Sequence, residues 1–271
     1  MIRLVCVDVD GTLVGSSGAV LPAIWPAAEH ARERGIRLAV CTGRPGFGFA
    51  FDYAKRLDAD GWHVFQNGAS IVHPASSRSL STSLPDGASA MLIARARANG
   101  RILELYNDQA YAVESSARRA SMHAELLGVP YAPRAFESLP GPLVRAQWLA
   151  AHEDEAGIFA EPHPGLELSW STSPVMADTL FVNMTAAGVD KAHAVRTVAA
   201  QYGVPMAQVM FVGDGNNDLG AMRAVGYPVA MANADDAVLS LACRVVGHVD
   251  DAGLVEALDL AGGADAAFLA R

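Results

Sequence analysis

An α/β fold with a parallel sheet is predicted by three features of the chain. Short apolar runs alternate with helix-like segments near both ends of the sequence, which is the pattern of βαβ units. Several of these runs end abruptly in polar turns. Between about 84 and 184 the alternation becomes irregular and prolines cluster. We therefore expect a discontinuous, Rossmann-like core over 1–83 and 185–271, interrupted by an inserted α+β domain over 84–184.

The composition argues against several classes of protein. With 271 residues, of which 51% are hydrophobic, the chain can bury a large core. A formal net charge of -9 disfavours binding to nucleic acid or to an anionic membrane. No apolar stretch is long enough to span a membrane, and Asp8 interrupts the N-terminal apolar run. We expect a cytoplasmic protein with a small-molecule partner, and the oligomeric state is not predicted.

The first apolar run ends in two acidic residues. Residues 2–7 are mostly apolar and branched, as in a buried parallel strand, and Asp8, Asp10, Gly11 and Thr12 follow. The carboxyl ends of strands are where open α/β sheets bind ligands. Two carboxylates there repel each other, which indicates a cation between them. An Asp before Gly-Thr can also form an ordinary turn, so the interpretation depends on partners farther along the chain.

The rest of the first core segment continues the alternation of helix and strand. Helices are predicted over 22–34 and 47–57, and strands over 36–41 and 62–66. The two strands end in the polar turns Thr42-Gly43-Arg44 and Asn67-Gly68-Ala69. Because parallel strands end at the same edge of a sheet, these turns are expected to lie beside Asp8 and Asp10.

The inserted domain and the second core segment complete the prediction. For the inserted domain we expect an antiparallel sheet with helices over 88–98 and 117–127 and strands over 102–106, 111–113, 143–147, 166–170 and 180–184. The core then resumes with a helix over 191–202 and a strand over 209–212, followed by Gly213-Asp214-Gly215-Asn216-Asn217-Asp218, a helix to 224, and strands over 228–231 and 244–246.

Taken together, the strand ends and one helix start predict a phosphoryl-transfer site. The chain has only two lysines, Lys55 and Lys191, and a lysine kept in an arginine-rich chain suggests a need for a compact ammonium at one site. Aspartates would hold Mg²⁺, while the Thr42 hydroxyl and the Lys191 ammonium would bind phosphate oxygens. Individually these features have ordinary explanations: a strand-ending turn, a solvated lysine, or a calcium-binding turn at Gly213 to Asp218.

The order and spacing of the motifs resemble the haloacid dehalogenase superfamily of phosphohydrolases. The four signatures correspond to Asp8-Val-Asp10-Gly-Thr, Thr42-Gly43-Arg44, Lys191, and Gly213-Asp214-Gly215-Asn216-Asn217-Asp218. The form of the last signature, the Asn67-Gly68-Ala69 turn and the long insertion look like the Cof-type, sugar-phosphatase branch with a type-two (IIB) cap. The resemblance covers the whole chain. Ala232 departs from it, because relatives often carry Gly there.

The resemblance implies a role for each charged residue. Asp8 would be the nucleophile that forms an aspartyl-phosphate. Asp10 would act as general acid and then as base, and its backbone carbonyl would touch the metal. Thr42 and Lys191 would hold the phosphoryl group. Asp214 would ligate Mg²⁺, and Asp218 would complete the metal shell directly or through water.

Further residues are expected to contact substrate or phosphate. This set comprises Gly43, Arg44, Asn67, Gly68 and Asn217. The inserted domain would choose the leaving group, but the sequence does not select among its candidates Arg118, Arg119, Arg134, Arg145, His152 and Trp170.

The function predicted is a Mg²⁺-dependent phosphatase that acts on a small phosphorylated metabolite, such as a sugar phosphate. A phosphomutase is an alternative, since it needs the same two aspartates. A more distant alternative is a signalling protein that keeps its aspartyl-phosphate, although receiver domains are shorter and lack the insertion. A non-catalytic binding protein is also distant, because it would be expected to have lost a charged member of the set.

Overall fold

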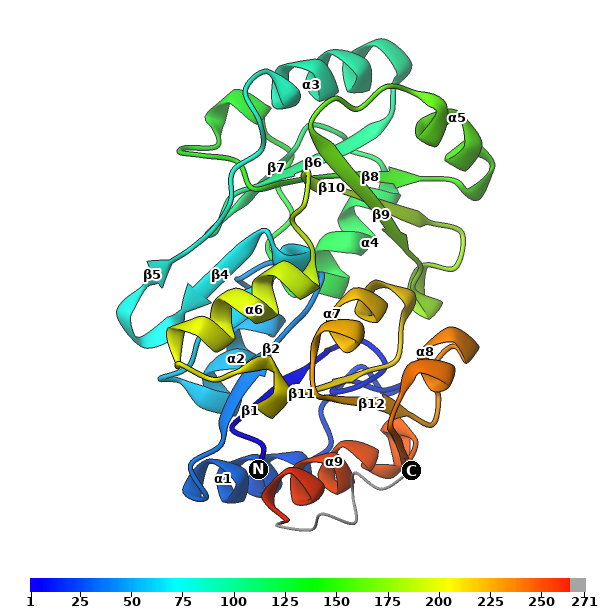
Figure 1. Ribbon diagram of the computed structural model, residues 1–271. Coiled ribbons are helices and arrows are strands. Elements are labelled where there is room, and N and C mark those ends of the chain that lie inside the picture. The colour runs from blue at the N-terminus through cyan, green and yellow to red at the C-terminus, as the bar shows by residue number, and fades with distance from the viewer. Residues whose placement is uncertain (264–271) are drawn as a thin grey trace.

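The computed structural model describes residues 1–263 and contains two main β-sheets, one above the other in Figure 1. The predicted core segment extends to 271, and its last residues, 264–271, lie outside the described part. No helix within the described residues is both long and apolar enough to cross a membrane. The predicted α/β fold class is confirmed, because the lower layer contains a parallel sheet.

The lower layer is built on a five-stranded parallel sheet in the order β13-β12-β11-β1-β2. Its strands are β1 (Leu4–Val7), β2 (Arg37–Val40), β11 (Val209–Gly213), β12 (Tyr227–Met231) and β13 (Arg244–Val246). A parallel bridge between Cys41 and Val64 joins β2 to β3. An antiparallel ribbon follows, formed by β3 (His63–Phe65), β4 (Ser70–His73) and β5 (Arg78–Ser79).

Helices cover both faces of the parallel sheet. One face packs against α1 (Ile24–Glu33), α2 (Phe49–Asp58) and α9 (Gly253–Gly262). The other packs against α6 (Lys191–Gln201), α7 (Leu219–Ala224) and α8 (Asp236–Leu241). Burial on both faces explains why β1 and β11 are apolar throughout. Because β1 lies between β11 and β2, the segments that follow these three strands meet at one edge.

The upper layer, here called the cap sheet, is a five-stranded antiparallel sheet in the order β7-β6-β8-β10-β9. Its strands are β6 (Ile102–Tyr106), β7 (Tyr111–Val113), β8 (Arg145–Ala150), β9 (Leu166–Ser171) and β10 (Leu180–Ala186). Two helices, α3 (Ala88–Asn99) and α5 (Glu155–Ala160), lie on its outer side, and α4 (Arg118–Leu127) lies on the side of the core (Figure 1).

Several element boundaries differ from the sequence prediction. Strand β8 begins at Arg145, two residues later than predicted, because Leu143 and Val144 are apolar but bond to Leu84 and Tyr106 before the ladder with β10 starts. Strand β10 continues to Ala186, so the predicted domain boundary at 184 falls inside it. The short elements β4, β5, α5 and α8 were not predicted, because each is too short to show a clear period. The helix α9 was also not predicted, although Leu254, Ala257, Leu258 and Ala261 follow a helical spacing.

His63 is expected to make the stability of the fold depend on pH. Its Nδ1 accepts a hydrogen bond from the Val40 backbone N–H at 3.0 Å, and its Nε2 donates to the Asp58 carbonyl oxygen at 2.7 Å. This pattern requires a neutral ring, and burial lowers the pKa of His63 from 6.5 to about 4. The stability that the neutral ring contributes is complete above the unfolded-state pKa and is lost as the pH falls toward 4.

The loss should be measurable by urea unfolding at several pH values. Between pH 7 and pH 4 the wild-type protein should lose about 3 kcal/mol relative to His63→Gln, whose amide does not titrate. Comparison with the variant cancels the contributions of the other titrating groups. Parallel stability curves for the two proteins would contradict the prediction.

Candidate active site

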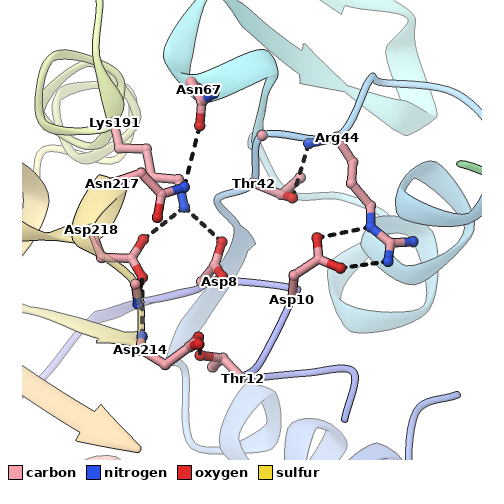
Figure 2. Close-up of polar contacts among 12 residues, drawn as sticks. Asp8, Asp10, Thr12, Thr42, Arg44, Asn67, Lys191, Asp214, Asn217 and Asp218 are labelled. Carbon is pink, nitrogen blue, oxygen red and sulfur yellow. Dashed lines mark hydrogen bonds and ion pairs between the residues drawn. The ribbon is translucent and has the colours of Figure 1, made fainter. Parts of the chain in front are cut away.

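The predicted site residues converge at the carboxyl edge of the parallel sheet. Asp8 and Asp10 follow β1, Thr42 follows β2, and Asp214 follows β11. Lys191 is the first residue of α6, whose N-terminus lies beside the segments after β3 and β11. Figure 2 shows the Lys191 side chain between Asp8 and Asp218, with the Asp214 side chain extending to Thr12.

Lys191 is buried between two carboxylates. Its Nζ donates to Asp8 Oδ1 at 2.6 Å and to Asp218 Oδ1 at 2.7 Å, and the residue is only 2% exposed. The helix start is set by Asp190, whose side chain accepts a hydrogen bond from the His193 backbone N–H. A lysine at this first helical position therefore reaches both aspartates without entering solvent.

The two aspartates of the last motif are fixed by hydrogen bonds. Asp218 Oδ2 accepts the backbone N–H groups of Asp214 and Gly215, at 3.0 and 3.1 Å. Asp214 Oδ1 accepts a hydrogen bond from the Thr12 hydroxyl at 2.7 Å. Gly11, with φ of 87°, lets the Asp214 carboxylate approach so closely that a β-carbon there would overlap it. The Gly-Thr part of the first motif thus positions an acid of the last one.

The acids form a donor set that fits a divalent cation. One oxygen from each of Asp8, Asp214 and Asp218 lies within 4.8 Å of the others. Burial raises the pKa of Asp214 to about 7, with neighbouring acids acting in the same direction, although the hydrogen bond from Thr12 lowers it. Burial also raises the pKa of Asp8 well above its usual value, even though the Lys191 charge opposes this shift. A single ammonium thus leaves carboxylate charge uncompensated, and Mg²⁺ prefers such oxygen ligands.

Asp10 is not part of this cluster of carboxylates. Its side chain is 60% exposed and turns toward Arg44, which donates from Nε to Oδ2 at 2.9 Å and from Nη2 to Oδ1 at 2.6 Å. Arg44, which the sequence analysis expected to bind substrate, is therefore engaged by Asp10 here (Figure 2). Both residues nevertheless line the cavity described below.

The loop after β2 is held from two sides. Thr42 is fully buried, and its hydroxyl oxygen accepts the Arg44 backbone N–H at 3.1 Å. The Thr42 carbonyl accepts the Asn67 N–H, which links the loop to the segment after β3. From the cap sheet, Arg145 donates to the Gly43 carbonyl oxygen at 2.7 Å. The orientation of the peptide at Gly43 therefore depends on a residue of the upper layer.

Asn67 and Asn217 line the site, whereas Gly68, which was also expected to contact substrate, does not line the cavity. Asn67 has a positive φ of 55°, and its Oδ1 accepts a 3.5 Å hydrogen bond from Asn217 Nδ2. Gly68 has a φ of 103°, and a β-carbon there would overlap the Asp190 carbonyl at the start of α6. These residues bring the Lys191 helix close to the strand ends.

A cavity of about 460 Å³ lies between this edge and the cap sheet. Asp8, Asp10, Gly43, Arg44, Asn67, Asp214 and Asn217 line its core side. Of the cap candidates, Arg145 and Trp170 line it, whereas Arg118, Arg119, Arg134 and His152 do not. Arg119 instead pairs with Asp178, and Arg134 donates to the Tyr111 carbonyl oxygen.

Several residues at this site were not predicted from the sequence. Thr12 belonged to a motif that was recognised, so its position beside the acids could have been inferred. The cavity is also lined by Asp235, His123, Gln147 and Asn183, which were not selected. The last two face the cavity only because of the register of β8 with β10, where Gln147 pairs with Asn183. No local pattern in the sequence carries that information.

A family of known proteins matches nearly the whole chain. The model of the haloacid dehalogenase-like hydrolases matches residues 5–258. The chain therefore belongs to this family, as the motifs predicted.

Individual relatives and solved structures show which members of this family the chain resembles. The pyridoxal phosphate phosphatase YbhA of Escherichia coli is 28% identical, over 90% of this chain and 93% of its own. The 5-amino-6-(5-phospho-D-ribitylamino)uracil phosphatase YwtE of Bacillus subtilis is 21% identical, over 95% of this chain and 97% of its own. Among solved structures, a sugar phosphatase of HAD subclass IIB superposes with a TM-score of 0.81 at 20% identity, covering 96% of this chain and 99% of that one. The chain is thus a phosphatase of the haloacid dehalogenase family with the subclass IIB fold.

The two lysines of the chain offer a matched test of the buried charge pair. Lys191→Met leaves two buried carboxylates without their cation and should lower the free energy of unfolding by about 3 kcal/mol or more. Lys55→Met removes an exposed pair with Asp52 and a contact with the Phe51 ring and should cost about 1 kcal/mol or less. Chemical denaturation of both variants measures the difference.

A second variant tests the cause of the loss. Adding Asp218→Asn to Lys191→Met removes one of the stranded charges and should restore part of the stability. Equal and small losses for the two lysine variants would show that Lys191 does not compensate buried charge.

Proposed function

We propose that this phosphatase is a Mg²⁺-dependent phosphomonoesterase that hydrolyses a small phosphorylated metabolite, a sugar phosphate or a similar compound, through an aspartyl-phosphate on Asp8. One observation carries the proposal. Asp8 is held by Lys191 through one oxygen only, while it lines a cavity that also contains Asp10 and Asp214. Its second oxygen, Oδ2, accepts no hydrogen bond within residues 1–263, and we assign to it the attack on phosphorus.

In the first step, Asp8 Oδ2 forms a bond to phosphorus as the ester P–O bond breaks. Asp10 gives its proton to the oxygen of the leaving alcohol. In the second step, Asp10 takes a proton from water that attacks the phosphoryl group. The bond between phosphorus and Asp8 then breaks, and inorganic phosphate leaves. Lys191 and Thr42 hold the phosphoryl oxygens during both steps, since each presents a donor at this edge.

Arg44 controls the position of Asp10 in this scheme. The two hydrogen bonds between them hold the carboxylate at the mouth of the cavity. Asp10 has to turn from Arg44 or share its oxygens to reach the leaving group. We therefore assign Arg44 to the positioning of Asp10 as well as to contact with the substrate.

Asp214 and Asp218, with Asp8 and the Asp10 backbone carbonyl, are the residues we expect to hold Mg²⁺. A bound Mg²⁺ supplies positive charge that offsets the carboxylates and the phosphate. The three carboxylates within 4.8 Å of one another support this assignment.

The substrate is proposed to be small because the cavity measures about 460 Å³ and is covered on one side by the cap sheet. The relatives named above act on pyridoxal phosphate and on a phosphorylated ribitylaminouracil, and a structural neighbour is a sugar phosphatase. A panel of phosphate esters, assayed with Mg²⁺ and with EDTA, tests reaction, metal and leaving group together. Release of inorganic phosphate separates hydrolysis from a mutase reaction, in which the phosphoryl group stays on the substrate.

Asp8→Asn should abolish turnover, because an amide oxygen is a far poorer nucleophile than a carboxylate. We expect kcat to fall about a thousandfold or more. Rapid quenching of the wild-type enzyme with a labelled phosphate ester should trap label on the peptide that contains Asp8. A variant that keeps wild-type turnover while retaining its fold would sink the nucleophile assignment.

Asp214→Asn should weaken the metal site without removing the nucleophile. The Mg²⁺ concentration for half-maximal activity should rise about tenfold or more, because one charged ligand is lost. Asp236→Asn, at an exposed aspartate outside the cavity, serves as the control and should leave the titration unchanged. Identical Mg²⁺ titrations for wild type and Asp214→Asn would remove Asp214 from the metal shell.

A further inference from the structure

Arg145 is a buried cation of the cap sheet that donates hydrogen bonds from only one of its three guanidinium nitrogens. It is 2% exposed, and its guanidinium stacks on the Tyr106 ring, 4.1 Å from the centroid. Its Nη1 donates to the Gly43 carbonyl at 2.7 Å and to Asn183 Oδ1 at 2.9 Å. In contrast, Nε and Nη2 are buried and have no hydrogen-bond partner within the described chain.

The charge of Arg145 also lacks a direct ionic partner. No carboxylate of residues 1–263 lies within 4.0 Å of it. Glu104, the acid of the neighbouring strand β6, acts on the Arg145 charge without forming an ion pair with it: its Oε2 accepts from Tyr106 and His123, and its Oε1 is buried with no hydrogen-bond partner in the described chain. Burial lowers the pKa of Arg145, which reflects the cost of keeping this charge away from water. A buried cation that is left unpaired beside a cavity is costly unless a ligand pairs with it.

The cavity has opposite charge at its two ends. The core side carries Asp8, Asp10, Asp214 and Asp235. Among the described residues that line the cap side, Arg145 is the one permanently charged side chain, and none is acidic. The phosphoryl group and Mg²⁺ belong at the acidic end, so the leaving group extends toward Arg145. Because Arg145 donates a hydrogen bond to Gly43 on the core side, the cap side and the core side of the cavity are in direct contact at this point.

We propose that Arg145 forms an anion subsite and that the natural leaving group carries a carboxylate. The inference rests on the proposed function and narrows its substrate class to phosphate esters of hydroxy or sugar acids. The Nε–Nη2 edge of a guanidinium presents two parallel donors, which match the two oxygens of a carboxylate. Both nitrogens are shielded from solvent in this structure, and the proposal therefore includes a shift of the cap sheet that lets the carboxylate reach them. The Gln147 amide, which also lines the cavity, lies on the same face of β8.

Two pairs of substrates that differ in a single group test the proposal. In 3-phosphoglycerate and glycerol 3-phosphate, and in 6-phosphogluconate and sorbitol 6-phosphate, a carboxylate replaces a CH₂OH group. The wild-type enzyme should prefer the acid of at least one pair by about tenfold or more in kcat/KM. Arg145→Met should bring that ratio close to one. The ratio is the readout because loss of the Gly43 contact would slow both members of a pair alike.

Controls separate the possible outcomes. Arg119→Met removes another cap arginine, outside the cavity, and should keep both the activity and the ratio of the wild type. If Arg145→Met does not fold, Arg145→Lys carries the test, and the lysine should lower the ratio about threefold or more because it lacks the planar fork. A wild-type enzyme that hydrolyses p-nitrophenyl phosphate but prefers neither acid overturns the inference, as does an unchanged ratio in the Arg145 variant. Failure to hydrolyse p-nitrophenyl phosphate would instead overturn the proposed function.

Discussion

The arrangement of the site depends on how buried carboxylate charge is compensated at one edge of a parallel sheet. Asp8, Asp214 and Asp218 lie within a few ångströms of one another, and their repulsion would open the edge if nothing opposed it. Lys191 opposes it from α6 by bonding to Asp8 and Asp218 at once. This pair of bonds ties the start of α6 to the strand ends of β1 and β11. The negative charge that remains makes this edge suitable for a divalent cation.

Close backbone approach is the second condition for this geometry. The Asp214 carboxylate packs directly over Gly11, and the Thr12 hydroxyl holds it there. At the other side, Gly68 allows the segment after β3 to touch the start of α6. Both glycines have positive φ, so a side chain would add backbone strain as well as overlap. These glycines are therefore needed because they let neighbouring groups approach the backbone closely, and not because they make the chain flexible.

The cap sheet supplies the part of the cavity that the core cannot. Its strands carry polar residues on the face that looks toward the core, among them Arg145, Gln147 and Asn183, all of them buried. An antiparallel sheet that merely covered the core would be expected to present apolar side chains there, because burying unsatisfied polar groups costs free energy. Their presence fits a surface that binds a polar ligand. The Arg145 bond to Gly43 also couples this surface to the loop that would hold the phosphoryl group.

The sequence by itself determined the α/β class, the order of the core strands' polar ends and the set of charged motifs. These features are local: an apolar run followed by Asp8 or Asp214 is visible in a few residues, and parallel strands must bring such ends together. Only the tertiary structure decided that Asp10 pairs with Arg44, that Lys191 bridges two acids, and that Arg145 rather than Arg118 or Arg134 faces the cavity. Those contacts join segments far apart in the chain. They depend on strand register and on the seating of the cap sheet above the core, neither of which leaves a periodic signal in the sequence.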